Sequence, residues 1–148
     1  MRNPILFAVA AAAAAAPAPA AAYAQDWRVV SIDEDTPHGR SVAYADAASV
    51  RRDGDEVRFV MQVRFSRPPE GMDSLRGRMR IQCSGRRWGS EGSALYLGEE
   101  SRREFPANAL EAVRPQTNAA IILDNLCNGR FETGTVDPAA HSRTVFER

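Results

Sequence analysis

Two stretches of alternating apolar and polar residues constrain the fold more than any other feature of this chain. They are EVRFVMQVRF (56–65) and SLRGRMRIQC (74–83). A period of two is typical of a β-strand with one buried face and one polar face. The segment between them, SRPPEGMD (66–73), contains adjacent prolines, which cannot sit in a paired strand. The sequence therefore predicts two strands joined by a loop.

The two faces of these strands differ sharply in character. The apolar positions are Val57, Phe59, Met61, Val63 and Phe65 in the first strand, and Leu75, Met79, Ile81 and Cys83 in the second. The other face carries five arginines: Arg58, Arg64, Arg76, Arg78 and Arg80. Val60 is the exception, an apolar residue on the arginine side. If the strands pair antiparallel, all five guanidinium groups stand on one sheet surface.

Weaker strand signals flank this pair. Further strands are predicted at 26–33, 41–46 and 93–98, with a polar loop at 33–40 that contains a proline and a glycine. Asp53-Gly54 is a strong signal for a two-residue hairpin turn. The prediction is thus a mostly antiparallel sheet.

The amino-terminal residues have the pattern of an export signal. A basic start is followed by the apolar run ILFAVAAAAAAA and by Ala22-Tyr23-Ala24, a small-x-small cleavage site. The run is shorter than the roughly 20 residues that span a bilayer. No cysteine stands near the cleavage site, so we do not expect a lipoprotein. We expect residues 1–24 to be removed and the mature protein to begin at Gln25.

Export determines how the two cysteines are interpreted. In an oxidising compartment, two cysteines in a small domain most often form a disulfide. One good helix is predicted at about 117–128, begun by Thr117, with Cys127 on its apolar stripe. Cys83 lies on the apolar face of its strand, so both sulfurs point into one core. The expected Cys83–Cys127 bond would tie the helix to the sheet.

These observations predict an α+β fold, in which a mostly antiparallel β-sheet carries one helix. The expected organisation is a signal peptide (1–24), a single β-rich domain (25–129) and a polar, flexible C-terminal tail (130–148). After removal of the signal peptide, no integral membrane segment is expected.

The order of features resembles the surface-adhesin protein E family of exported bacterial proteins. YADAASVRRDG is similar to that family's Tyr-x-Asp-x-x-Ser-hydrophobic-x-basic-x-Gly pattern, and Trp27 opens the domain as in the family. A long strand that ends in Cys83, a strand with Tyr96 and a late helix that ends in Cys127 follow in the same order. The resemblance implies a mostly antiparallel sheet with a disulfide-tied helix, and a protein that binds rather than catalyses.

Two interpretations of the arginine side remain open. It is either a binding surface for sulfated glycans, acidic protein segments or phosphate-bearing lipid, or a solvated face whose charges are compensated by acidic neighbours. The candidate neighbours are Glu99, Glu100 and Glu104. Nucleic acid is not an expected partner, because the chain has 19 basic and 19 acidic residues.

The sequence gives no support for catalysis. His38 and His141 are isolated in polar segments, and both cysteines are assigned to a disulfide, so metal and Cys-His nucleophile sites lack residues. No cofactor and no metal are expected.

Two classes of function remain: an adhesin-like binding protein, and a small periplasmic inhibitor of lysozyme-like enzymes or an envelope-maintenance protein. An adhesin would use the arginine face to engage an extracellular or envelope protein or an acidic glycan. An inhibitor would insert the loop 66–73 into an active-site cleft. Periplasm and outer surface are both compatible with export, and a homodimer is left open.

Overall fold

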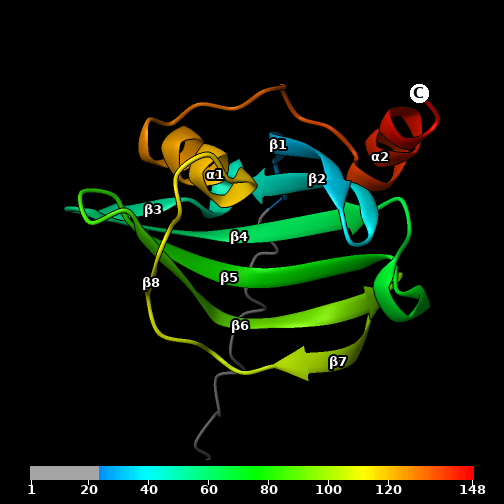
Figure 1. The fold of residues 1–148 in the computed structure, drawn as a ribbon, viewed down its shortest axis with the longest axis horizontal. Coiled ribbons are helices and arrows are strands. Elements are labelled where there is room, and N and C mark those ends of the chain that lie inside the picture. The colour runs from blue at the N-terminus through cyan, green and yellow to red at the C-terminus, as the bar shows by residue number, and fades with distance from the viewer. Residues whose placement is uncertain (1–23) are drawn as a thin grey trace, which may run out of the picture.

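An antiparallel sheet is the frame of the computed structural model, which describes residues 24–148. The sheet's main path, shown in Figure 1, runs in the order β1 (Trp27–Thr36), β2 (Gly39–Asp46), β4 (Glu56–Phe65), β5 (Ser74–Gln82), β6 (Arg87–Leu97) and β7 (Glu100–Phe105). Short β3 (Arg51–Asp53) pairs with β4, and β8 (Glu111–Ala112) pairs with β6. The predicted signal peptide lies outside the described residues, except for Ala24.

The two strands with the clearest alternation form the centre of the sheet, as predicted. β4 and β5 pair antiparallel from Glu56↔Gln82 to Arg64↔Ser74. The loop between them holds a single 3-10 turn, η2 (Pro69–Gly71). The mainly antiparallel sheet expected from the sequence is therefore confirmed.

Three segments differ from the sequence prediction. The expected loop 33–40 is mostly strand, because β1 continues to Thr36 and pairs there with Gly39 across a two-residue turn. β6 begins at Arg87 and so is longer than the predicted strand 93–98. β7 was not predicted, since its sequence, ESRREF, has no apolar alternation and it lies at the edge of the sheet.

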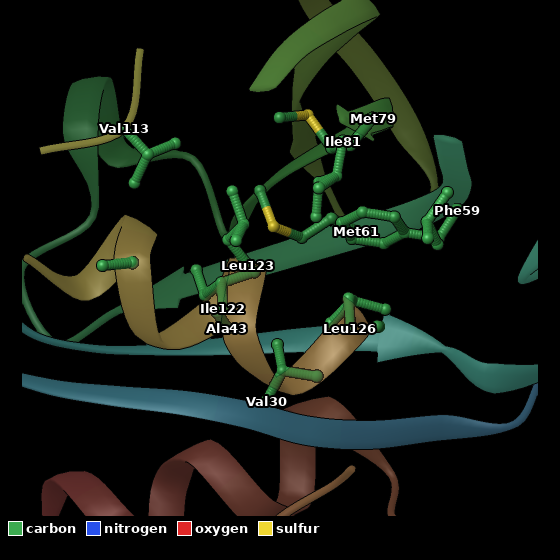
Figure 2. Packing of buried hydrophobic residues seen from close by; sticks show 13 residues of the cluster. Val30, Ala43, Phe59, Met61, Met79, Ile81, Val113, Ile122, Leu123 and Leu126 are labelled. Atoms are coloured by element: carbon green, nitrogen blue, oxygen red, sulfur yellow. The ribbon is translucent and has the colours of Figure 1, made fainter. Parts of the chain in front are cut away.

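The main hydrophobic core lies between the sheet and helix α1 (Asn118–Cys127). Thr117 begins the helix by accepting a hydrogen bond from the Ala120 N–H through its side chain, as its sequence position predicts. Figure 2 shows Ile122, Leu123 and Leu126 of α1 among the apolar side chains of the strands. The Cys83–Cys127 disulfide joins the end of α1 to the end of β5 across a Cα–Cα distance of 5.8 Å.

A second helix, α2 (Pro138–Phe146), corrects the predicted organisation. The sequence predicts one helix and a flexible tail at 130–148, whereas the structure has α2 packed on the sheet face opposite α1. Val145 is buried there with Trp27, Val29, Val42 and Tyr44.

This cluster also accounts for Val60, the apolar exception on the arginine side, which packs against it. The residues that begin α2 are of the kinds commonly found at the start of a helix. Asp137 accepts a hydrogen bond from the Ala140 N–H, and proline occupies the first turn.

The segment that connects the two helices seals one edge of the sheet. The N–H groups of Glu132 and Val136 donate to the carbonyls of Val29 and Trp27, each at 2.8 Å. The Val29 N–H in turn donates to Thr133 Oγ1 at 3.1 Å. The outer edge of β1 is thereby covered, which protects it from pairing with another chain.

The helices cover only part of the sheet. Both gather toward β1 and β2, and no helix of the described chain lies over β6 and β7 (Figure 1). None of the helices between residues 24 and 148 is both long and apolar enough to span a bilayer. The candidate site lies on the uncovered part of the α2 face.

Candidate functional site

The motif shared with the resembled family builds a structural corner between β2 and β4. Asp46 Oδ1 accepts hydrogen bonds from the N–H groups of Asp26 at 2.8 Å and Ala48 at 3.1 Å, which begins the 3-10 turn η1 (Ala47–Ser49). Ser49 Oγ donates to the Asp46 carbonyl at 2.7 Å and accepts from the Val60 N–H at 2.8 Å. These polar groups satisfy buried backbone, so their role here is positioning the strands rather than binding.

The five arginines lie on two adjacent strands, and the pairing places them on the α2 face. Across β4 and β5, Arg58 is opposite Arg80, and Arg78 is opposite Val60, which packs against the α2 cluster. Two guanidinium groups directly across a strand pair repel each other unless carboxylates or a ligand lie between them.

Three of the five arginines, Arg58, Arg64 and Arg76, form ion pairs or hydrogen bonds with other side chains of the protein. Arg58 Nε lies 2.6 Å from Glu56 Oε1 and 3.5 Å from Glu91 Oε1. Arg64 Nε donates to Ser142 Oγ of α2 at 3.0 Å.

Arg76 is held by several groups at once. Its guanidinium donates to Glu99 Oε2 at 2.9 Å and to the Gly98 carbonyl at 3.1 Å, and its Cζ lies 4.7 Å from the Tyr96 ring centre. This pairing, through its hydrogen bonds first and its charge second, lowers the pKa of the Glu99 carboxyl.

Arg78 and Arg80 are not compensated in this way. Within residues 24–148, neither forms an ion pair, and the buried Nε of Arg80 has no hydrogen-bond partner. Of the three acidic neighbours proposed from the sequence, Glu99 pairs with Arg76, whereas Glu100 pairs with Arg102 of its own strand at 2.8 Å. The compensation is therefore partial, and Arg78 and Arg80 are left without an ion-pair partner among the described residues.

The surface around these arginines is hollowed. One hollow, of about 500 Å³, lies over β5 and β6 and is bordered by Arg76, Arg78, Tyr96 and Glu104. A second, of about 560 Å³, lies at the amino end of α2 and is bordered by residues that include Gln62, Arg64 and Asp137.

Gln25, Trp27 and Arg76 border both hollows. We call the two hollows together the arginine trough; its arginines are Arg64, Arg76 and Arg78, whereas Arg58 and Arg80 border neither hollow. Sequence reasoning placed its arginines on one surface but missed Gln25, Trp27 and Gln62, because only the position of α2 shows which part of that surface stays open.

The other candidate regions are less suited to binding charged groups. The loop 66–73 borders a third hollow on the α1 face, lined mainly by apolar side chains such as Phe65, Leu75 and Leu95. Glu70 of that loop is paired with Arg103 of β7. In the described part of the chain, no three His, Cys, Asp or Glu side chains gather as metal ligands would.

Comparison with known proteins agrees with the motif and the fold. No curated protein matches the chain. The family described as Surface-adhesin protein E matches residues 27–128, from the first residue of β1 to the cap of α1. This match covers more than half of the sequence and includes both cysteines. The chain belongs to the surface-adhesin protein E family.

Proposed function

We propose that this chain is an exported, non-enzymatic binding protein that engages an acidic partner through the arginine trough. The observation that carries the proposal is Arg78, which borders the trough, together with Arg80 two residues farther along β5. Among the described residues, neither is paired with a carboxylate. Planar guanidinium groups bind carboxylate, sulfate or phosphate through two parallel hydrogen bonds. Family membership supports an adhesive role and a location outside the cytoplasm.

The charge distribution favours local recognition over general attraction. The whole sequence carries equal numbers of acidic and basic residues, so its net charge does not draw anions from a distance. An acidic partner, whether an extracellular protein segment or an acidic glycan, is then held where Arg78 and Arg80 concentrate positive charge. Such contacts weaken as salt rises, because the screening length is roughly 8 Å at physiological ionic strength.

Heparin retention of the mature domain tests the proposal. Replacing both free arginines, Arg78→Gln with Arg80→Gln, should shift elution to clearly lower salt. The matched control is Arg114→Gln with Arg130→Gln, which removes the same charge from exposed positions that flank α1 on the opposite face. If both double variants elute together, the loss reflects net charge alone and the trough has no special role.

Export is a separate part of the proposal. The mature protein is expected to begin at Gln25, which amino-terminal sequencing of the secreted product checks directly. A product that retains Met1 outside the cytoplasm would contradict cleavage. Labelling of intact cells with an impermeant reagent then distinguishes the outer surface, where the protein is labelled, from the periplasm, where an inhibitor would stay unlabelled.

A further inference from the structure

The two halves of the arginine trough differ in charge, and this difference indicates what kind of ligand fits. The hollow over β5 and β6 is bordered by Arg76 and Arg78 and by one acid, Glu104. The hollow at α2 is bordered by two arginines but by three carboxylates: Asp73, Glu99 and Asp137. The first hollow is the more positive of the two, so an anionic group is favoured there over the second hollow.

Each carboxylate of the second hollow already accepts a hydrogen bond or pairs with an arginine, so we do not propose a cation site there. Asp137 Oδ1 accepts from the Ala140 N–H at 2.7 Å, and Asp73 Oδ2 accepts from the Gly98 N–H at 2.5 Å. Glu99 is paired with Arg76. The hollow is therefore polar, with two arginines against three carboxylates, and its carboxylates already have hydrogen-bond partners. A neutral group that both donates and accepts hydrogen bonds matches this lining.

Gln62 supports a neutral ligand group in the second hollow independently of the charges. It is only 3% exposed, yet its side-chain amide hydrogen-bonds to no group of residues 24–148 and instead borders the second hollow. Buried amides in folded proteins almost always have partners. An amide oxygen and NH₂ on a residue that borders this hollow suit neighbouring hydroxyl groups, one donating and one accepting.

The spacing of these groups suits a short chain of sugar units. Gln62 is opposite Arg76, and Arg78 is two positions farther along β5. Diagonal neighbours of this kind lie about 7–8 Å apart, within the span of a disaccharide. Trp27 borders both hollows and offers an apolar edge for the carbon side of a sugar ring.

From these observations we infer that the arginine trough binds an acidic glycan. A neutral, hydroxyl-bearing sugar unit lies on Gln62, and the carboxylate or sulfate of the adjacent unit lies on Arg78, with Arg80 two residues beyond it on β5. The inference rests on the proposed function and specifies its ligand. An acidic peptide segment would place further carboxylates against Asp73, Glu99 and Asp137.

The test uses the mature domain and three probes. A hyaluronan hexasaccharide alternates a uronic acid with a neutral N-acetylhexosamine, tripolyphosphate is an anion without sugar, and octaglutamate is an acidic peptide. Calorimetry gives each dissociation constant for wild type, Gln62→Met and Arg78→Gln with Arg80→Gln. Gln62→Met should weaken hexasaccharide binding roughly five- to tenfold, as expected for one or two lost hydrogen bonds. It should leave tripolyphosphate within twofold, while the arginine variant weakens both.

A second measurement on the wild type does not depend on how the variants fold. In ¹H–¹⁵N spectra, the hexasaccharide should shift the side-chain NH₂ of Gln62, and tripolyphosphate should not. If the hexasaccharide binds but neither the Gln62 signal nor the Gln62→Met affinity changes, the sugar subsite is refuted and the arginine contact stands. Binding of octaglutamate without the hexasaccharide also refutes the glycan assignment alone. Failure of all three probes to bind refutes the proposed function together with this inference.

Discussion

Reduction of the Cys83–Cys127 disulfide should destabilise the protein without impairing the arginine trough. The bond closes a loop of 44 residues that contains β6, β7 and most of α1. In the chain-entropy model, closing a loop of this length raises the free energy of the unfolded chain by about 4 kcal/mol at 25 °C. For a domain of this size, each kcal/mol moves the thermal midpoint by roughly 3–5 °C, so the expected decrease is about 12–20 °C.

The assay is thermal unfolding with and without reductant, followed by circular dichroism. A Cys83→Ala, Cys127→Ala double variant is the control, because its midpoint should already be low and should not respond to reductant. Heparin retention of the reduced protein should be unchanged, since the disulfide lies on the face opposite the trough. A decrease of less than about 3 °C in the wild type would refute the loop-entropy reasoning.

Three further predictions concern the helices. Leu123→Ala should cost about 2–5 kcal/mol in chemical denaturation, because Leu123 is 1% exposed, whereas Ile121→Ala on the same helix, 48% exposed, should cost far less. Burial first, and a nearby arginine second, lower the pKa of His141 below its usual 6.5. The unfolded chain then takes up the proton first, so stability should fall as pH drops below 6.5, and His141→Gln should flatten this dependence. Val145→Asp should cost about 3 kcal/mol or more, by placing a charge in the buried α2 contact, while exposed Thr144→Asp should leave the thermal midpoint nearly unchanged.

The parts of the fold that the sequence predicts well are those in which local pattern and tertiary environment agree. β4 and β5 alternate because the residues of one face pack on α1, whereas α2 covers only part of the other face and leaves most of its residues polar. For the helix at 117–128, the Thr117 cap, the apolar stripe and the position of Cys127 all predict the same element.

The elements that sequence reasoning missed depend on their neighbours. β7 is a strand because β6 offers it a partner, not because ESRREF favours one. α2 has a recognisable start in Asp137-Pro138, but its apolar contribution is concentrated at Val145 and Phe146, too little for a periodic signal.

For the candidate site, too, the sequence predicts the local pattern but not the contacts between elements. Alternation was enough to place the arginines on one surface, but it could not show which of them are paired. Arg58 meets Glu91 beside an irregularity in the β5–β6 pairing, where β6 has one extra residue between the partners of Gly77 and Met79. Gln62 would be read as an exposed polar residue of the arginine face, and its burial follows from the docking of α2 on β4.

The dimensions of the elements explain why part of each sheet face stays uncovered. The six strands of the main path span about 24 Å at roughly 4.8 Å per pairing. A helix of ten residues, such as α1, is about 15 Å long and roughly 10 Å wide, so one helix cannot cover a face of this sheet in any orientation. The uncovered part must be either polar or hollow. On the α1 side it is the apolar hollow near Leu75 and Leu95. On the α2 side it carries the arginines, and it is this charge that led us to propose an acidic ligand there rather than at the apolar hollow.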